Sequence, residues 1–417
     1  MIIKVLIVGT GGREHAIAKA LSKTRRKIEI YAVGAWINPG IAAVGHVDIL
    51  DINKNGTVVE YAQIKEIDTV IIGSENQLAQ GLADALNSAG IFCIGPTREL
   101  AQLETDKIYA RELLPSRYNP KYRVFDQDNY SFDNLKEYLV ELDYNYVVKA
   151  VGLRGGKGVQ ISGVHLQTIA EAHNCCSQLI KEDGRVLIEE RLFGEEFTLL
   201  AFTDGKHLLN MPVVKDFKRR DDGDSGPNTG GMGCISFAGK SAPFLTTTDL
   251  VTAKEVNQYV LSKLPGYIGI LYGSFMKTSA GIKVIEYNCR FGDPEAINVL
   301  ELLQTDFVDI LSAMYSSSLD QLKVQWSKDA MVTNYVVAPG YPDSPRNADL
   351  ILPITGNTIF AKITRNSDNI YTQLSSRSVA VWSRGKNMRI AYAKNQELLN
   401  LVVGDCHYRT DIGNRQQ

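Results

Sequence analysis

Several features that would point to particular classes of protein are scarce or missing in this chain. Its six cysteines and six histidines are scattered without a C-x-x-C pair, so we expect neither a zinc site nor disulfides. Lysine and arginine (45) nearly balance aspartate and glutamate (47), which gives no reason to expect nucleic-acid binding or attraction to a membrane surface. No apolar run approaches the length of a membrane span, and the first residues lead directly into a strand. We therefore expect a cytoplasmic protein with reduced thiols.

What the chain does have is length and an ordinary globular composition. With 417 residues, 44% of them apolar, it is too long for one hydrophobic core, so roughly two to four domains are expected. Over residues 1–104, predicted strands (3–8, 28–33, 69–73, 91–94) alternate with two predicted helices, one that follows the turn Gly9–His15 and ends at about Leu21 and one over about 78–89. This alternation predicts a parallel, doubly wound sheet.

A glycine turn follows the first predicted strand, with the sequence Gly9-Thr10-Gly11-Gly12-Arg13-Glu14-His15. It does not fit a dinucleotide site, because Glu14 stands where a third glycine is needed and no acidic residue ends the second strand. The turn suits an anion at a helix N-terminus, with Arg13 adding positive charge. An ordinary tight turn is the alternative.

The next part of the chain is predicted to begin with a helix from Glu104 to about Arg117, which carries Lys107, and to continue as a small α+β unit over about 120–190. Within that unit, Gly152-Leu153-Arg154-Gly155-Gly156-Lys157-Gly158 lies between two predicted strands. Four glycines with two cations suit a mobile flap whose amides cover phosphates, although a simple hairpin turn is possible. It is not a P-loop, because a strand follows it. Lys149 is a further candidate partner for phosphate.

Two polar segments then stand out between strongly patterned ones. Residues 215–233 (KDFKRRDDGDSGPNTGGMG) are dense in charge and glycine; a flexible linker is possible, but we expect an ordered active-site loop. The second polar segment is residues 283–295 (KVIEYNCRFGDPE), which a single predicted helix over 298–314 follows. Two-residue periodicity places Glu286 and Asn288 on one face of a strand. These oxygens could hold Mg²⁺, or they could belong to a solvated strand end.

In this order, the motifs resemble the ATP-grasp ligases, and most closely the phosphoribosylamine–glycine ligase family of purine biosynthesis. The residues that carry the resemblance are Gly11–His15, Gly95–Thr97, Gly155–Val159, Ile188–Glu190, Gly194–Glu196, Gly226–Gly233 and Asn288–Glu295. The resemblance implies an N-terminal substrate-binding domain (1–104), an ATP-grasp domain (105–328) with the flap subdomain at about 120–190, and a small β-rich C-terminal domain (329–417).

The resemblance also implies a reaction. ATP phosphorylates the carboxylate of glycine, and the amine of 5-phosphoribosylamine then attacks the acyl phosphate. The implied cofactors are ATP and Mg²⁺ (or Mn²⁺). The partners are small molecules, with no nucleic acid or membrane, and the chain is expected to be a monomer or a weak homo-oligomer.

The residue roles implied by the resemblance fall into groups. The ATP-binding residues are Lys107 and Lys149 for the phosphates, Gly155, Gly156, Lys157 and Gly158 for the flap, Glu189 and the Leu192 backbone for adenine, and Glu196 for the ribose. The metal ligands are Glu286 and Asn288. The residues around the glycine carboxylate and acyl phosphate are Arg290, Lys218 and Arg219. The remaining substrate-binding residues are Gly11, Gly12, Arg13, Glu14, Glu75, Asp293 and Pro294.

The chain departs from the family pattern at several positions. Thr10 replaces an Asn, Val151 an Asp and Ala296 a Gln, while Ser375–Val379 stands where the family has G-G-R-V. The residues implied for ATP and the metal are retained, whereas those near the amine substrate and in the C-terminal part are altered. Two other hypotheses therefore stand beside the purine-pathway ligase. One is a paralogue that joins a different carboxylate and amine, and the other is a nucleotide-binding protein without catalysis.

Overall fold

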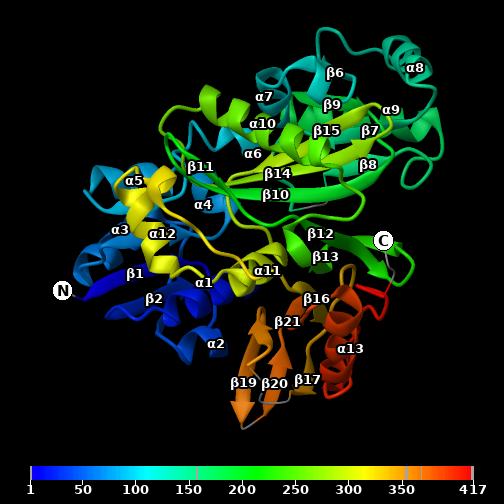
Figure 1. Ribbon diagram of the computed structural model, residues 1–417. Coiled ribbons are helices and arrows are strands. Elements are labelled where there is room, and N and C mark those ends of the chain that lie inside the picture. The colour runs from blue at the N-terminus through cyan, green and yellow to red at the C-terminus, as the bar shows by residue number, and fades with distance from the viewer. Residues whose placement is uncertain (1, 156–157, 353–355, 368, 415–417) are drawn as a thin grey trace.

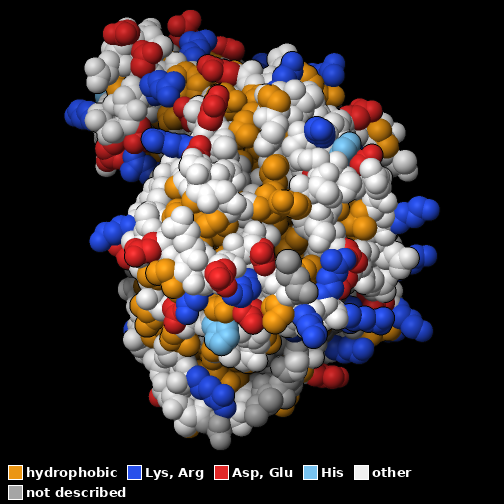
Figure 2. All heavy atoms as spheres, turned by 90° about the vertical axis from the view of Figure 1, so that its left-hand side faces the viewer, with side chains coloured by type: hydrophobic (Ala, Val, Ile, Leu, Met, Phe, Trp, Pro, Cys, Tyr) orange, Lys and Arg blue, Asp and Glu red, His pale blue; other side chains and the backbone are white. Residues whose placement is uncertain are grey.

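The computed structural model describes residues 2–155, 158–352, 356–367 and 369–414 of the chain. Figure 1 shows the N-terminal sheet at the lower left, a large sheet through the centre and the unit of residues 120–190 at the upper right. None of the helices in the described part combines the length and hydropathy that a bilayer crossing requires. Figure 2 shows acidic and basic side chains intermingled over one face, as the nearly balanced composition predicts.

The N-terminal part is the predicted doubly wound parallel sheet, in the strand order β3-β2-β1-β4-β5. The strands are β1 (Ile3–Val8), β2 (Ile28–Gly34), β3 (His46–Ile49), β4 (Thr69–Ile72) and β5 (Phe92–Ile94). The helices are α1 (Gly12–Ser22), α2 (Pro39–Ala42), α3 (Asn55–Ile64), α4 (Glu75–Ala79) and α5 (Leu82–Ser88). Three elements were not predicted: β3 and α2 have only four residues each, and α3 buries only Val58 and Ala62.

Three helices predicted as continuous are each interrupted, and the interruptions have local causes. The helix predicted over 78–89 divides into α4 and α5 at Gly81, whose φ of 77° leaves the helical region. The helix from Glu104 divides into α6 (Gln102–Thr105) and α7 (Lys107–Leu113), because Asp106 caps α7 by accepting from Ile108 N (2.9 Å). A short 3-10 turn, η1 (Ser116–Tyr118), follows α7.

The third interruption lies near the end of the central part. The helix predicted over 298–314 is α11 (Glu295–Leu302) and α12 (Phe307–Tyr315), and Asp306 caps α12 through Val308 N (3.0 Å). Such caps compete locally with helix continuation, which a count of apolar spacing does not detect.

Residues 122–190 form the expected α+β unit with its own apolar core. The antiparallel sheet has the order β6-β9-β7-β8, with β6 (Tyr122–Asp126), β7 (Tyr146–Ala150), β8 (Val159–Ile161) and β9 (Arg185–Glu190). The helices are α8 (Phe132–Glu141) and α9 (Ile169–Asp183). The segment between β7 and β8 contains the predicted flap, of which Gly156 and Lys157 lie outside the described residues.

The central sheet has the order β15-β14-β10-β12-β13-β16-β21-β18, with β11 beside β10. Its strands are β10 (Glu195–Asp204), β11 (Leu208–Asn210), β12 (Val214–Asp221), β13 (Ser225–Ser236), β14 (Ile268–Thr278), β15 (Gly281–Asn288), β16 (Ala330–Val337), β18 (Thr358–Phe360) and β21 (Arg377–Gly385). The remaining helices are η2 (Ala238–Lys240), α10 (Thr247–Lys263), η3 (Leu319–Gln321) and α13 (Met388–Leu399), the last of which was not predicted.

The prediction of a loop over 215–233 is wrong, because this segment is the hairpin β12–β13. Its charge and glycine content concealed the strands from a search for alternating apolar residues. The pairing is nevertheless irregular, with register shifts between Phe217 and Arg219 and between Arg219 and Asp221.

The strands of the C-terminal part are divided between two sheets. Strands β16, β18 and β21 extend the central sheet beyond β13, while β17 (Ala348–Ile351), β19 (Ile363–Ser367), β20 (Ile370–Gln373) and β22 (Val403–Gly404) form a separate sheet. Figure 1 shows this smaller sheet below the central one. The domain limits at 104/105 and 328/329 stay a prediction.

Gly81 and Gly56 provide a matched test of backbone conformation. Gly81→Ala should lower the thermal midpoint, since an alanine at φ 77° costs about 1 kcal/mol. Gly56→Ala should raise it, because Gly56 lies within α3 and an added Cβ meets nothing within 4 Å. Thermal unfolding followed by circular dichroism would measure both, and a shift of the same sign for the two variants would contradict this interpretation.

Candidate active site

Glu286 lies at the end of β15, surrounded by cations. The extra residue of a bulge, Ile285, precedes it, so that Glu286 pairs with Ser274 of β14. Burial alone would raise the pKa of Glu286, but the positive charges of Lys218, Lys149 and Lys107 outweigh burial and lower the pKa. The lowered pKa keeps this carboxylate ionised, and no described residue donates a hydrogen bond to it.

The second predicted metal ligand, Asn288, ends the same strand. Its Oδ1 accepts a long hydrogen bond from Arg290 Nη2 (3.4 Å), which leaves acceptor capacity. A carboxylate and an amide oxygen fit a hard cation such as Mg²⁺, which keeps several waters or phosphate oxygens as further ligands. The described residues contain no group of three or more His, Cys, Asp or Glu side chains placed to hold a metal.

A buried ion cluster connects the flap subdomain to β15. The carboxylate of Glu189 pairs with Arg111 (2.6 and 3.1 Å) and with Lys149 (2.6 Å). Arg111 also donates to the carbonyls of Val284 (3.0 Å) and Ile285 (2.5 Å). Lys149 and Glu189 were predicted to bind phosphate and adenine; here they contact each other, and their roles toward ATP stay predictions. Arg111 was missed, and its only signal is an arginine among apolar positions of a predicted helix.

Lys107 and the described end of the flap lie beside this cluster. Lys107 Nζ donates to the carbonyl of Gly152 (3.0 Å), and burial lowers the lysine pKa although Glu286 opposes the shift. Gly158 accepts from Ala150 N (2.8 Å), and Gly155 has a φ of 55°. The flap cation Arg154 instead pairs with acids at the end of α9, at 3.0 Å from Glu182 and 2.6 Å from Asp183.

On β12, Lys218 forms a second cluster of opposite charges. It pairs with Glu196 of β10, which also accepts from Ser274 Oγ (3.3 Å), and it lies 3.6 Å from Asp216. Burial raises the pKa of Asp216 to about 7 although Lys218 opposes the shift. These carboxylates in turn hold the pKa of Lys218 well above its usual value against burial. Asp216 was not among the predicted site residues.

Arg219 does not join Lys218, with which it was grouped from the sequence. Its guanidinium donates to the carbonyl of Gly226 (2.9 Å), on the other strand of the same hairpin. Successive residues of a strand point to opposite faces, so the two cations face different surroundings. Leu192, the remaining predicted adenine contact, lies beyond the end of β9 and is separated from it by Arg191.

Arg290 joins the N-terminal part to the central sheet. Its guanidinium pairs with Glu75 (3.2 Å) and with Glu104 (3.0 Å). Burial alone would raise the pKa of Glu75, yet Arg290 and Arg13 lower it to about 2. Glu104, which was missed, also accepts from Cys289 N (2.6 Å). The structure thus brings the predicted substrate residues Arg13 and Glu75 together with the predicted catalytic Arg290.

Part of the glycine turn before α1 is already hydrogen-bonded within the turn itself. The buried carboxylate of Glu14 accepts from Gly11 N (2.7 Å) and pairs with Arg13 Nε (2.8 Å). Arg13 Nη1 donates to the carbonyl of Phe291 (2.9 Å), which fixes the arginine toward the β15–α11 loop. The Gly11 amide is therefore already bonded, and Glu14 positions the turn that holds Arg13.

Asp293, which precedes Pro294, is bonded to residues of the C-terminal part of the chain. Asp293 accepts from Tyr335 OH (2.5 Å) and from Arg377 Nη2 (2.9 Å). Arg377 Nη1 also donates to the carbonyls of Asp293 (2.6 Å) and Gly230 (2.6 Å). A Cβ on Gly12 would lie 2.1 Å from the Tyr335 hydroxyl, so only glycine fits there. Arg377 was missed, although it is the arginine retained where the family pattern G-G-R-V is otherwise lost.

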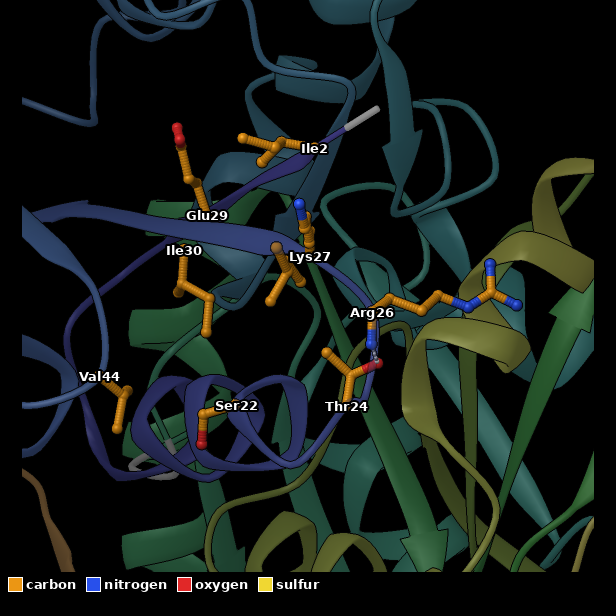
Figure 3. A pocket seen from close by; sticks show the side chains of 9 residues that line it. Ile2, Ser22, Thr24, Arg26, Lys27, Glu29, Ile30 and Val44 are labelled. Carbon is orange, nitrogen blue, oxygen red and sulfur yellow. Dashed lines mark hydrogen bonds between the residues drawn. The ribbon is translucent and has the colours of Figure 1, made fainter.

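A surface pocket of about 460 Å³ lies elsewhere, between β2 and the end of α1. Figure 3 shows Ser22, Lys27, Ile30 and Val44 around it. None of its lining residues is a predicted site residue.

Comparison with known proteins identifies the family. The family model described as phosphoribosylglycinamide synthetase, N domain, matches residues 3–104, and that described as phosphoribosylglycinamide synthetase, ATP-grasp (A) domain, matches residues 105–296. The phosphoribosylamine–glycine ligase of Methanocella arvoryzae is 43% identical over 99% of this chain and 96% of that protein. That of Pyrococcus furiosus is 40% identical over 99% of this chain and 95% of that protein.

Solved structures give the same result. The phosphoribosylamine–glycine ligase of Thermotoga maritima aligns with a TM-score of 0.81 at 28% identity, covering 98% of this chain and all (100%) of that one. A biotin carboxylase domain from Hydrogenobacter thermophilus, solved with MgADP, aligns with a TM-score of 0.73 at 16% identity over 97% of this chain and 91% of that one, which shows the fold alone. The family-model matches and the fold define an ATP-grasp ligase, a class that uses ATP with Mg²⁺. Within that class, the chain belongs to the phosphoribosylamine–glycine ligase family.

The buried position of Asp216 gives a testable pH dependence. Its pKa is about 7 in the folded chain against 3.8 for an ordinary aspartate, so the folded state holds more protons between these values. The wild-type chain should therefore lose stability relative to Asp216→Asn as the pH rises from about 4 to about 7. Thermal midpoints measured across this range would show the difference, with the exposed Asp343→Asn as a control that stays parallel to wild type. Parallel curves for Asp216→Asn would contradict the assignment.

Proposed function

We propose that this chain joins glycine to 5-phosphoribosylamine through an acyl phosphate, giving glycinamide ribonucleotide, ADP and phosphate. The observation that carries the proposal is the arrangement around Glu286. Cations from the flap subdomain, the central sheet and α7 converge on this carboxylate, and Arg290 links it to Glu75 of the N-terminal part. The full-length similarity to phosphoribosylamine–glycine ligases supports the choice of substrates.

The charges of the site suit phosphoryl transfer, which depends on positioning and charge stabilisation more than on covalent chemistry. Lys107, Lys149 and Lys218 lie around one point and would neutralise the phosphates and the acyl phosphate. Glu286 and Asn288 would hold Mg²⁺ or Mn²⁺, which supplies further positive charge between the phosphate oxygens. Closure of the flap over this point would exclude water, which otherwise hydrolyses an acyl phosphate.

The amine substrate would lie between the N-terminal turn and the β15–α11 loop. Arg13 and Arg290 provide positive charge there, and Glu75 is held ionised between them. An ionised carboxylate beside two arginines is suited to orient a polar sugar phosphate that carries an amine. The closing loop Asp293–Pro294, fixed by Tyr335 and Arg377, would border the same space.

One observation keeps a paralogue with another amine as a second candidate. The hydroxyl of Thr10, which stands where the family has Asn, is buried and has no hydrogen-bond partner among the described residues. In contrast, two other residues that differ from the family pattern are packed in apolar surroundings. Val151 contacts Ile108 and Leu187 in a small apolar core, and Ala296 is fully buried in α11.

A coupled assay of ADP release tests the proposed function directly. The chain should release ADP only when glycine and freshly formed 5-phosphoribosylamine are both present with MgATP, and MnATP should also serve. Release with another acid–amine pair would instead support the paralogue. ATP binding without any turnover would favour a non-catalytic nucleotide-binding protein.

Replacement of the predicted metal ligand tests the centre of the site. Glu286→Gln keeps the shape but removes the charge, so kcat should fall about 100-fold or more, because removal of one preorganised electrostatic group costs roughly that much. Steady-state kinetics at rising Mg²⁺ would measure the effect, with Glu137→Gln on the exposed face of α8 as the matched control. Near-normal turnover in a folded Glu286→Gln would refute the metal assignment.

A further inference from the structure

The last described segment of the chain lies against the tip of the β12–β13 hairpin. Within this segment the side chain of Arg409 is only 1% exposed, and it is among the largest fully buried side chains of the chain. A buried guanidinium is costly unless its donors are satisfied, so its partners show what this residue holds in place.

Among the described residues, the partners of the Arg409 guanidinium lie on the hairpin or in the segment itself. Nε and Nη2 each donate to the carboxylate of Asp411 at 2.8 Å. Nη1 donates to Asp224 Oδ1 (2.8 Å) at the hairpin tip and to the carbonyl of Arg219 (3.0 Å). The guanidinium also lies over the ring of Phe217, 5.1 Å from its centroid.

Neighbouring contacts strengthen this attachment on the hairpin side. Thr410 N donates to Asp222 Oδ1 (2.8 Å), and Gly223 N donates to Asp411 Oδ2 (2.9 Å). His407 Nε2 lies 3.0 Å from the carbonyl of Arg220. Every residue from Arg219 to Asp222 therefore lies close to a group of the segment 407–411, either by these bonds or by the 3.4 Å approach of His407 to Asp221.

The segment is in turn anchored to the rest of the C-terminal part. Asn334 of β16 donates to the carbonyl of Arg409 (2.7 Å), and Tyr392 of α13 donates to the carbonyl of Thr410 (3.0 Å). His407 and Val337 exchange backbone hydrogen bonds (2.8 and 3.0 Å). Residues 407–411 thus connect a regular part of the sheet to the hairpin tip.

The hairpin requires such support because its own ladder is incomplete. Phe217 pairs with Gly233 and Arg219 with Asn228, so a step of two residues on β12 faces a step of five on β13. The glycines of this stretch add conformational freedom. Within the hairpin, Thr229 Oγ1 donates to the carbonyl of Lys218 (2.9 Å), while the residues that follow, Arg219 to Asp222, are held by segment 407–411 from outside the hairpin.

The alternation of side chains along β12 places Arg409 on the face opposite to Lys218, which is a candidate catalytic residue. Phe217 and Arg219 meet Arg409, whereas Asp216 and Lys218 belong to the opposite face of β12, where Lys218 reaches Glu196. We infer that Arg409 is a positioning residue, which fixes the β12–β13 hairpin so that Lys218 stays at the site of acyl-phosphate chemistry. This inference rests on the proposed function for the chemistry, and on the contacts above for the positioning.

Three variants and one control test this inference. Arg409→Met removes the hydrogen bonds but keeps an apolar stem against Phe217, and Arg409→Lys restores one positive charge. Asp224→Asn removes a charged partner at an exposed tip position, where Asn tolerates the φ of 57°, and so leaves the buried core intact. Arg346→Met is the matched control, because Arg346 pairs with Asp405 on the surface and both side chains are more than 60% exposed (67% and 62%).

Hydrogen exchange and kinetics should separate positioning from general damage. Amides of residues 217–229 should exchange at least about tenfold faster in Arg409→Met, with β7 and β9 unchanged. The kcat for ADP release with glycine and 5-phosphoribosylamine should fall about tenfold, while the affinity for MgADP, measured by calorimetry, stays within about twofold. Arg409→Lys should recover part of the kcat, Asp224→Asn should lower kcat about two- to threefold, and Arg346→Met should behave as wild type.

The outcomes against the inference differ from those against the function. Unchanged exchange and unchanged kcat in Arg409→Met, or an unchanged kcat despite faster exchange, would overturn the inference while leaving an active ligase. If Arg409→Met does not fold, Asp224→Asn decides by the same two measurements. A wild-type chain that releases no ADP with these substrates would overturn the proposed function, and the exchange data would then show only a structural contact.

Discussion

The buried contact of Glu189 with Arg111 and Lys149 is the interaction on which the rest of the site depends. Charges removed from water are costly, and a buried ion pair is tolerated only when every remaining donor and acceptor is satisfied. Here the carbonyls of Val284 and Ile285 receive the other guanidinium hydrogens. Because those carbonyls belong to the β15 bulge, the same contact sets the strand that carries Glu286. The flap subdomain, α7 and the predicted metal ligands are thereby held in one arrangement.

Much of the fold could be predicted from the sequence because most elements follow one apolar period each. The alternation over the first part of the chain gives the parallel sheet, and the boundaries of β1 agree with the predicted strand to the residue. Predictions failed where polar chemistry decides the local structure. Side chains such as Asp106 and Asp306 end or begin helices, and the β12–β13 hairpin is built from residues that mostly lack apolar side chains.

The same distinction applies to the site. Lys107, Lys149 and Lys218 were assigned by their positions relative to the motifs of the ATP-grasp ligases, and the structure places all three near Glu286. Arg111, Glu104, Arg377 and Arg409 could not be predicted, because each acts through partners far away in the sequence. Arg377, for example, contacts Gly230 and Asp293 from the other end of the chain. A single residue within an apolar or degenerate pattern carries no local signal of a contact that only the folded chain creates.

The pairing of the site lysines has a consequence for how a nucleotide would bind. Lys149 already pairs with Glu189, and Lys218 with Glu196, so neither cation awaits an anion. An ammonium group has three donors, so a phosphate that engages either lysine shares it with a carboxylate of the chain itself. Repulsion between that carboxylate and the phosphate then offsets part of the attraction between the phosphate and the lysine, and the free energy of nucleotide binding is smaller than exposed charges would give. The same repulsion applies to any other anion that enters the site.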